Sequence, residues 1–376
     1  MNNINFNLDN AVKYHYGQFP PQSIDYQLVM NAMIGATEAI ARFDQMLKNI
    51  HNSEILLAPL RNQEAVISSR MEGTISTIDE IMRYDADYGD TSEYSNEVRE
   101  DIIETVLYQR TLKGVQQALN DGYPFSKALL KMMHQQLLSY GRGAKKSPGE
   151  FKKEQNYLGD HFKQSILFVP ISPEKLEEGL DNLFDYINNN STPILLKTAI
   201  SHLEFEALHP FQDGNGRIGR MLITLILWRS QIISAPHFYI SGYFEEHKNT
   251  YIDLMREVSE TGNWNNWCIF FLNAIKEQAQ ANLLIAERIT QLYENMKTEF
   301  AVLLSSKWSI NALEFIFTNP VFRSTSFTVK SGIPKSTAIK FTKILQEHNI
   351  LEVIEEGAGR TPTLYAFEPL MKLVRI

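Results

Sequence analysis

A twelve-residue segment with the sequence HPFQDGNGRIGR, His209–Arg220, contains residue types that bind phosphate groups. Gly214, Asn215 and Gly216 stand just before an apolar run that predicts a buried helix. At such a helix start the backbone N–H groups lack intrahelical partners and the helix dipole is positive, which favours an anion. The two glycines also let the backbone approach phosphate oxygens closely. The segment therefore predicts a phosphate cradle.

Side chains that suit phosphate chemistry surround this cradle. Arg217 and Arg220 are three residues apart and lie near one another on the first helical turn, where two guanidinium groups suit a polyphosphate. Asp213 fits a ligand for Mg²⁺ that bridges phosphates better than it fits a bare anion. His209 titrates near neutral pH and is a candidate base for the proton of an attacking hydroxyl.

Each feature alone also has an ordinary structural explanation. A histidine before a proline is commonly structural, a GNG segment is commonly a turn, and an arginine pair at a helix start commonly faces solvent or a carboxylate. Their combination within one short segment favours the functional interpretation. Phe211 is the exception, because an aromatic residue there is expected to anchor the loop in the core.

Length and composition indicate an ordinary soluble protein. The 376 residues suggest two or three domains at roughly 100 to 200 residues each. Hydrophobic residues make up 44% and charged residues 21%, and the single cysteine, Cys268, fits a reducing compartment. We see no secretory leader and no apolar run of membrane-spanning length, so a cytoplasmic location without membrane attachment is expected. The net charge of −8 argues against nucleic-acid binding by the whole chain.

Apolar residues recur mostly at helical spacing, which predicts a mainly α fold. Arg61–Asp79 predicts a helix followed by a turn. Ile194–Leu208 predicts a helix before the motif, and Arg217–Ile233 predicts a centrally buried helix after it. In contrast, Gly141–Pro173 predicts a long loop or hairpin with a β-like run at Ile166–Val169.

The pattern changes towards the C-terminus. Three short helices and a hairpin are predicted there, at Ala312–Phe317, Ser324–Ser331, Pro334–His348, and Ile350–Ile354 with Pro362–Phe367. This is a winged helix-turn-helix layout. The stretch Val321–Ile376 has eight basic and five acidic side chains, a net charge of +3, and Lys335, Lys340 and Lys343 are candidates for facing a phosphate backbone.

The motif HPFQDGNGRIGR matches the signature of Fic-domain proteins, HPFx[DE]GNGRxxR, at every fixed position. The chain resembles the bacterial Fic proteins that have an N-terminal inhibitory helix. The resemblance implies a Fic helical fold with a small β-hairpin flap plus a C-terminal winged helix-turn-helix domain. It divides the chain into an N-terminal helical region with the inhibitory helix (1–105), a Fic catalytic domain (106–300) and a winged-helix domain (301–376).

The resemblance also implies roles for the motif residues. His209 would be the general base and Asp213 the Mg²⁺ ligand, while Gly214, Asn215 and Gly216 would hold the α- and β-phosphates and Arg217 and Arg220 the β- and γ-phosphates. Family members mostly move AMP from ATP to Ser, Thr or Tyr hydroxyls and release pyrophosphate. Relatives that phosphorylate instead replace the second glycine and the following arginine, which are intact here. The resemblance therefore implies a protein adenylyltransferase.

Two further segments resemble parts of the family's nucleotide site. Leu158, Gly159, Asp160 and His161 fall where the flap nears ATP, although a plain surface hairpin is an equally good interpretation of each residue. Tyr251 falls where family members present an aromatic ring to the adenine, although a core tyrosine is nearly as well supported.

A built-in brake is implied by the segment SSRMEG, Ser68–Gly73. It fits the family's inhibitory pattern [ST]xxxE[GN] with Ser68, Glu72 and Gly73 at the fixed positions. By resemblance, Glu72 would pair with Arg220 and prevent that arginine from holding the γ-phosphate productively. An ordinary exposed glutamate is the alternative. In some relatives the same glutamate assists removal of AMP, so reversal stays open.

The sequence is also compatible with other functions. The main alternative is a DNA-binding transcriptional regulator whose Fic unit only senses nucleotide, and the winged helix could equally contact protein or DNA. Transfer of another nucleotide differs only in pocket shape. The protein target is unknown from sequence, and a homodimer is left open.

Overall fold

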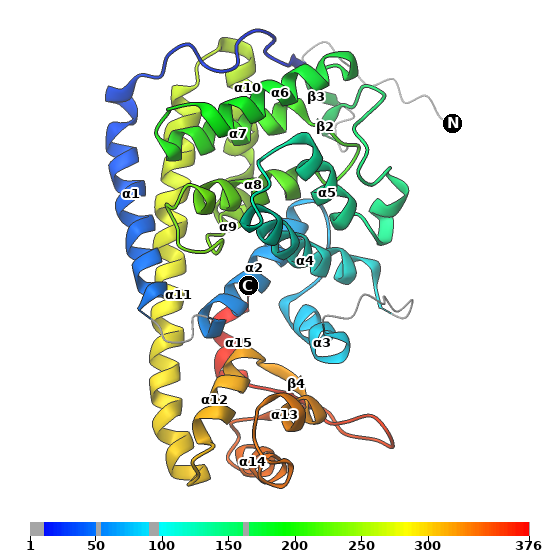
Figure 1. Ribbon diagram of the computed structural model, residues 1–376, viewed down its shortest axis with the longest axis vertical. Helices are drawn as coiled ribbons and strands as arrows, with labels where there is room; N and C mark the ends of the chain where they lie inside the picture. The colour runs from blue at the N-terminus through cyan, green and yellow to red at the C-terminus, as the bar shows by residue number, and fades with distance from the viewer. Residues whose placement is uncertain (1–10, 50–53, 90–97, 161–164, 376) are drawn as a thin grey trace. The chain divides into compact units, whose positions relative to one another are not determined.

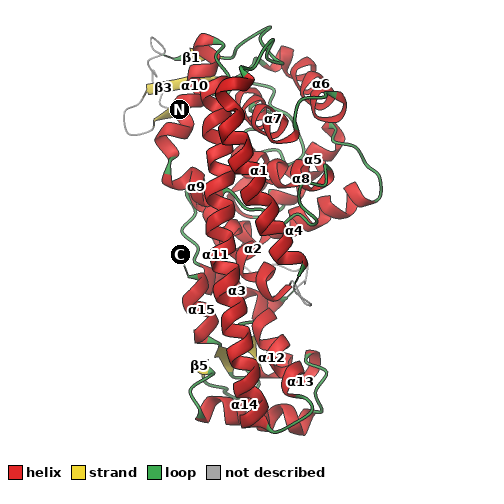
Figure 2. Cartoon of the chain, turned by 90° about the vertical axis from the view of Figure 1, so that its left-hand side faces the viewer, coloured by secondary structure: helices red, strands yellow, loops and turns green. Residues whose placement is uncertain are grey.

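The computed structural model describes residues 11–49, 54–89, 98–160 and 165–375 of the chain. Helices dominate these residues and two small sheets complete the fold, which confirms the mainly α prediction (Figure 2). Among the described helices, none has the length and apolar character needed to cross a bilayer.

The chain forms two compact units. Unit 1 comprises Met1–Asp44, Ile67–Gly73 and Leu107–Gln280, and unit 2 comprises Gln45–Val66, Thr74–Val106 and Ala281–Ile376. Four helices contribute residues to both units, namely α1 (Tyr26–Lys48), α2 (Glu54–Met71), α4 (Glu100–Asn120) and α11 (Asn265–Leu304). The division into 1–105, 106–300 and 301–376 stays a prediction.

Unit 1 contains the predicted motif. Its further helices are α5 (Lys127–Leu137), the 3₁₀ turn η1 (Gly141–Lys145), α6 (Pro173–Asn189), α7 (Ile194–Leu208), α8 (Asn215–Arg229), α9 (Ser241–Glu246) and α10 (Lys248–Thr261). The sequence predicted α7 with its observed bounds. The predicted helix at Arg217–Ile233 begins two residues earlier and ends at Arg229.

The helices α7 and α8 form the centre of this unit and lie side by side (Figure 1). Both are apolar on nearly every face, and twelve residues of each are buried. Fully buried aromatic residues contact them from other segments, with Phe238 O accepting from Thr224 Oγ1 of α8 and Trp267 Nε1 donating to Ala199 O of α7. Because the motif connects two buried helices, its ends are fixed by the core of the unit.

A small sheet belongs to the same unit. Its strands are β1 (Val12–Lys13), β2 (Leu158–Asp160) and β3 (Ser165–Val169), in the order β1-β3-β2. The strand β1 runs parallel to β3, and β2 runs antiparallel to it with Gly159 opposite Ile166. The predicted hairpin within Gly141–Pro173 is therefore confirmed, and β2 lies at an edge of the sheet.

Unit 2 contains the predicted C-terminal elements. They are α12 (Ser309–Thr318), β4 (Val321–Arg323), α13 (Ser324–Lys330), α14 (Lys335–Glu347), β5 (Glu352–Glu355), β6 (Leu364–Ala366) and α15 (Glu368–Val374). The sheet order is β4-β6-β5, and both pairings are antiparallel. The three predicted helices and the hairpin are present, and assignment to the winged helix-turn-helix class stays a prediction.

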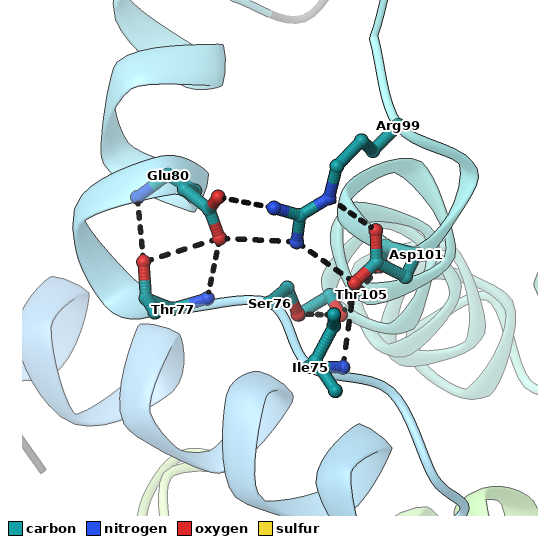
Figure 3. Close-up of polar contacts among 7 residues, drawn as sticks. All are labelled: Ile75, Ser76, Thr77, Glu80, Arg99, Asp101 and Thr105. Atoms are coloured by element: carbon teal, nitrogen blue, oxygen red, sulfur yellow. Dashed lines mark hydrogen bonds and ion pairs between the residues drawn. The ribbon is translucent and has the colours of Figure 1, made fainter.

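The helix α3 (Ile78–Tyr88) of unit 2 begins with a capping box. Thr77 Oγ1 accepts from Glu80 N at 3.3 Å, and Thr77 N donates to Glu80 Oε2 at 2.9 Å (Figure 3). The guanidinium of Arg99 lies between Glu80 and Asp101, at 2.7 and 3.0 Å from their nearest oxygens. Asp101 in turn accepts from the backbone of Ile75. These contacts fix the chain that follows Gly73 in the sequence.

The helix predicted within Arg61–Asp79 is present and is followed by a turn. The observed helix α2 ends at Met71, and Gly73 adopts a positive φ of 91° that suits a turn. Ile75 lies beyond the helix and its side chain is exposed. The helix followed by a turn that the sequence predicted is therefore confirmed.

Candidate functional site

The backbone turns sharply where α7 ends and α8 begins. His209 follows α7 in the left-handed region, with φ 44° and ψ 61°, and its N–H donates to Phe205 O. For a residue with a Cβ this conformation costs about 1–3 kcal/mol, so surrounding contacts must hold it. Gly214 is also left-handed, with φ 78°, and its carbonyl accepts from Ile218 N to start α8. The N–H groups of the first turn of α8 have no intrahelical acceptor.

The loop between the two helices is held from within. The side-chain amide of Asn215 accepts from Phe211 N and donates to Phe211 O, both at 2.9 Å. Phe211 is fully buried, as the sequence predicted, and stacks on the His134 ring at 3.7 Å between centroids. Since the Asn215 amide is committed to the loop, its backbone N–H is the group left for an anion.

His134 of α5 joins this loop to a second one. Its Nδ1 accepts from Gly149 N at 2.8 Å, so the neutral ring carries its proton on Nε2 and donates to Asp213 O at 3.1 Å. Burial lowers the pKa of His134 to about 4, which keeps the ring neutral. The carbonyl of Asp213 is thereby fixed, while its carboxylate is left for other partners.

The segment before β2 contacts the backbone of the motif at several points. Lys152 N donates to Pro210 O at 2.8 Å, and Lys152 Nζ donates to Leu208 O at 3.0 Å. Asn156 Nδ2 donates to the carbonyls of His209 and Phe211, each at 3.0 Å. These hydrogen bonds satisfy carbonyls that a loop inside the fold would otherwise leave unpaired.

The imidazole of His209 is neutral at physiological pH. Burial lowers its pKa to about 4, and the neighbouring Lys152 ammonium acts in the same direction. Its Nδ1 is buried and makes no hydrogen bond with the described residues, although the nearby Glu206 carbonyl favours the protonated ring. A neutral imidazole can accept a proton, which is the property required of a general base.

Arg217 and Asp213 lie together at the start of α8. Arg217 Nη2 is 3.4 Å from Asp213 Oδ1, the arginine side chain is buried, and the carboxylate is 36% exposed. The carboxylate is accessible beside the free N–H groups of the helix. Its position fits a ligand for a divalent cation that is bound mainly by phosphate oxygens.

Arg220 is buried and its donors point to the SSRMEG segment. Arg220 Nε donates to Ser68 Oγ, and Nη2 donates to Ser68 O and to Glu72 Oε1, all at 2.8 Å. Burial opposes ionisation of Glu72, but the charge and hydrogen bond of Arg220 outweigh it and lower the Glu72 pKa. Burial likewise opposes the charge of Arg220, and Glu72 raises its pKa above the ordinary value. Both groups are therefore ionised.

The Glu72 carboxylate also lies against the predicted phosphate cradle. A Cβ placed on Gly216 would collide with Glu72 Oε1 and would lie 2.9 Å from Arg220 Nη1. Only glycine permits this approach. The carboxylate thus occupies space beside the first turn of α8, where an anion would be stabilised.

Two cavities adjoin this arrangement. The first has a volume of about 170 Å³ and is lined by Glu72, His209, Gly216, Arg220 and Tyr251, among others. The second has about 240 Å³ and is mostly apolar, with Leu158, Leu167, Phe168 and Met255 in its wall. Glu206 and Ile252 line both cavities. An elongated ligand with one apolar and one anionic end would match the pair.

The flap residues of the sequence prediction lie partly at these cavities. Leu158 and Gly159 line the apolar cavity, and β2 contains Asp160. His161 lies outside the described residues. Tyr251 lines the smaller cavity, and its buried hydroxyl lies 2.9 Å from His202 Nε2. The tyrosine is thus both packed in the core and adjacent to the site, and its contact with the adenine ring of a nucleotide stays a prediction.

The sequence interpretation missed several residues of this site. Lys152, Asn156 and His134 hold the motif loop, and Glu206 lines both cavities with Oε1 buried and without a hydrogen bond to any described residue. Burial raises the pKa of Glu206 to about 8. The sequence predicts a long loop or hairpin at Gly141–Pro173, but no spacing rule connects its residues to the motif.

Two family models match consecutive segments of the chain. The Fic/DOC family model matches residues 124–227, and the Fic/DOC family N-terminal model matches residues 30–117, together just over half of the chain. The chain belongs to the Fic/DOC family. The first match includes the complete motif, and the second includes Ser68, Glu72 and Gly73.

Sequence relatives of this Fic/DOC chain are adenylyltransferases by name. The protein adenylyltransferase fic-1 of Caenorhabditis elegans is 37% identical over 102 residues, which is 26% of this chain and 18% of the relative. A probable protein adenylyltransferase of Aquifex aeolicus is 25% identical over 213 residues, 55% of this chain and 58% of the relative. The chain therefore spans less than two thirds of the length of these curated relatives.

Solved structures share the fold. A Fic family protein from Desulfovibrio desulfuricans G20 has a TM-score of 0.57 at 16% identity, over 93% of this chain and 98% of that one. Fic-1 from C. elegans has a TM-score of 0.53 at 18% identity, over 70% of this chain and 74% of that one. At these identities the likeness concerns the fold alone.

Proposed function

We propose that this Fic/DOC chain transfers AMP from ATP to the hydroxyl of a Ser, Thr or Tyr side chain on a protein, including its own chain. Three features of the site support the proposal. A neutral histidine, an accessible carboxylate and two buried arginines surround a glycine-flanked helix start. The relatives named as protein adenylyltransferases support the same activity.

The two cavities suggest how ATP binds. Its triphosphate would contact the N–H groups of Gly216 and Arg217 and the guanidinium groups of Arg217 and Arg220. Its base would enter the apolar cavity between Leu158 and Met255. The α-phosphate would then lie beside His209, because that residue and Gly216 line one cavity.

The chemistry requires one bond to form and one to break. The target hydroxyl oxygen bonds to the α-phosphorus, the bond between this phosphorus and the bridging oxygen to the β-phosphate breaks, and pyrophosphate leaves. His209 takes the hydroxyl proton. The positive end of α8 and the two arginines stabilise the negative charge that develops on the phosphates. Asp213 would hold Mg²⁺, which when bound neutralises phosphate charge.

We also propose that the chain is self-inhibited, and the single observation that carries this is the contact between Glu72 and Arg220. Arg220 has its Nε and Nη2 donors engaged by Ser68 and Glu72. The Glu72 carboxylate would repel a γ-phosphate that approached the same guanidinium. ATP would therefore bind productively only after the last turn of α2 and Glu72 move away.

Labelled ATP tests the reaction. The Glu72→Gly chain is incubated with Mg²⁺ and ATP that carries the label on either the α- or the γ-phosphate. We expect protein-bound label from α-labelled ATP only, with stoichiometric pyrophosphate. Label from γ-labelled ATP would instead indicate phosphoryl transfer. Absence of both, with ATP binding retained, would favour a nucleotide sensor.

A second candidate function is supported by one surface of unit 2. Lys335, Lys340 and Lys343 are all exposed on α14, the helix that would enter DNA in a winged helix-turn-helix domain. Salt-dependent binding to duplex DNA that is lost when the three lysines are replaced by glutamate would support a DNA-binding regulator. Equal binding by both proteins would exclude this surface.

A further inference from the structure

Four consecutive backbone carbonyls, from Leu208 to Phe211, accept hydrogen bonds from Lys152 or Asn156, and the Phe211 carbonyl also accepts from Asn215 Nδ2. Lys152 donates to Leu208 and Pro210, and Asn156 donates to His209 and Phe211. The two donors are themselves joined, because Lys152 Nζ donates to Asn156 Oδ1 at 2.8 Å. Every side-chain contact of this pair with the motif is therefore directed at the backbone that holds His209.

The conformation of His209 explains why such support is needed. Its left-handed backbone is unfavourable for a residue with a Cβ, and such strain persists only where surrounding structure fixes it. Asn156 Nδ2 donates to the carbonyl of His209, the strained residue, and to the carbonyl of Phe211. Lys152 holds the carbonyls on either side of His209 in the sequence. The strained residue is thus fixed on both flanks.

We propose that Lys152 and Asn156 are positioning residues that hold the His209 imidazole in line for proton transfer, without themselves binding the nucleotide. The inference rests on the proposed AMP transfer. Neither residue lines the two cavities described above. Asn156 lies two residues before β2, so the same segment also determines where the edge strand of the flap begins.

The expected signature is a loss of turnover at unchanged nucleotide affinity. Asn156→Asp keeps the size of the side chain and the oxygen that faces Lys152, but removes both donors to the motif. A small displacement of the His209 imidazole from the geometry for proton transfer is expected to lower kcat about 10- to 100-fold. The dissociation constant for ATP should stay within about threefold, because the cradle donors belong to α8.

A matched pair of lysine variants gives a second readout. Lys152 is buried beside His209, whereas the adjacent Lys153 is exposed. The Lys152 ammonium disfavours the imidazolium, so Lys152→Met should raise the pKa of His209, and Lys153→Met should leave it unchanged. NMR titration of ¹⁵N-labelled His209 measures this without any turnover.

The experiment compares these variants in the full chain that carries Glu72→Gly. The proposal is supported if Asn156→Asp lowers kcat at constant ATP affinity and Lys152→Met alone shifts the His209 titration upward. It is overturned if kcat stays within threefold of the parent, if ATP affinity falls as much as kcat, or if both lysine variants titrate alike. Should Asn156→Asp fail to fold, kcat and ATP affinity of Lys152→Met, compared with Lys153→Met, decide by the same criteria. A parent that transfers no AMP would refute the proposed function, while the titration would still test whether Lys152 lies beside His209 as the structure has it.

Discussion

Arg220 Nη2 lies 2.8 Å from Glu72 Oε1, which joins the first turns of α8 to a residue 148 positions earlier in the sequence. The arginine side chain is 2% exposed and the glutamate 33%. A charge as buried as that of Arg220 requires a partner. Under the proposed function the same guanidinium would bind the γ-phosphate, so Glu72 and ATP would compete for it.

Replacement of His209 by alanine should abolish turnover but preserve nucleotide binding. Loss of a general base typically lowers the rate about 10²- to 10⁴-fold. We expect at least a hundredfold loss of AMP transfer in the Glu72→Gly chain, measured by labelling, with ATP affinity within about threefold. His348→Ala, at an exposed histidine of unit 2, is the control. A His209→Ala protein that labels at the parental rate would remove this residue from the mechanism.

The pH dependence of turnover should lack the usual histidine limb. The pKa of His209 is lowered to about 4 by burial and by Lys152, and a base acts in its deprotonated form. Glu72 favours the protonated ring, so Glu72→Gly should move the midpoint further down. We therefore expect kcat to be constant between about pH 6 and 8. An acid limb centred near the ordinary histidine pKa would show that the imidazole is more hydrated than the structure indicates.

A second ion pair should contribute to inhibition through the end of α2. Arg70 Nε and Nη2 bind both carboxylate oxygens of Glu245, at 2.6 and 2.7 Å, and Lys248 Nζ donates to Met71 O at 3.4 Å. The pair is about one-third exposed, so its contribution is small, about 0.2–1 kcal/mol.

Glu245→Gln should therefore raise basal labelling about two- to fivefold. In the Glu72→Gly chain the same change should have no further effect, because the brake is already absent. Glu246→Gln, at the exposed neighbouring position, is the matched control. An equal increase in both backgrounds would assign Glu245 a role outside inhibition.

The sequence predicted the motif helices well because their apolar patterns are long and their glycines mark the turn. The helix α7 was predicted with its observed bounds, and the hairpin that contains β3 was also found. Both depend on local rules of periodicity and turn formation. The pairing of Glu72 with Arg220 came from family resemblance, and the structure has the contact.

Long-range contacts account for what the sequence could not predict. The hydrogen bonds of Lys152 and Asn156 to the motif join residues more than fifty positions apart, and nothing in a lysine or an asparagine of a polar loop indicates such partners. The left-handed backbone of His209 is also invisible in the sequence, because a histidine followed by a proline occurs in many ordinary turns.

The central claim is that Glu72 holds an otherwise competent AMP transferase inactive. Intact-mass analysis of the wild-type, Glu72→Gln and Glu72→Gly chains, after incubation with Mg²⁺ and ATP, tests it most directly. We expect the mass of AMP to be added slowly to the wild-type chain, faster to Glu72→Gln, and about 10- to 100-fold faster to Glu72→Gly, as for a brake that holds most molecules inactive. Equal rates in the three folded proteins, or no added mass in any of them, would contradict the account.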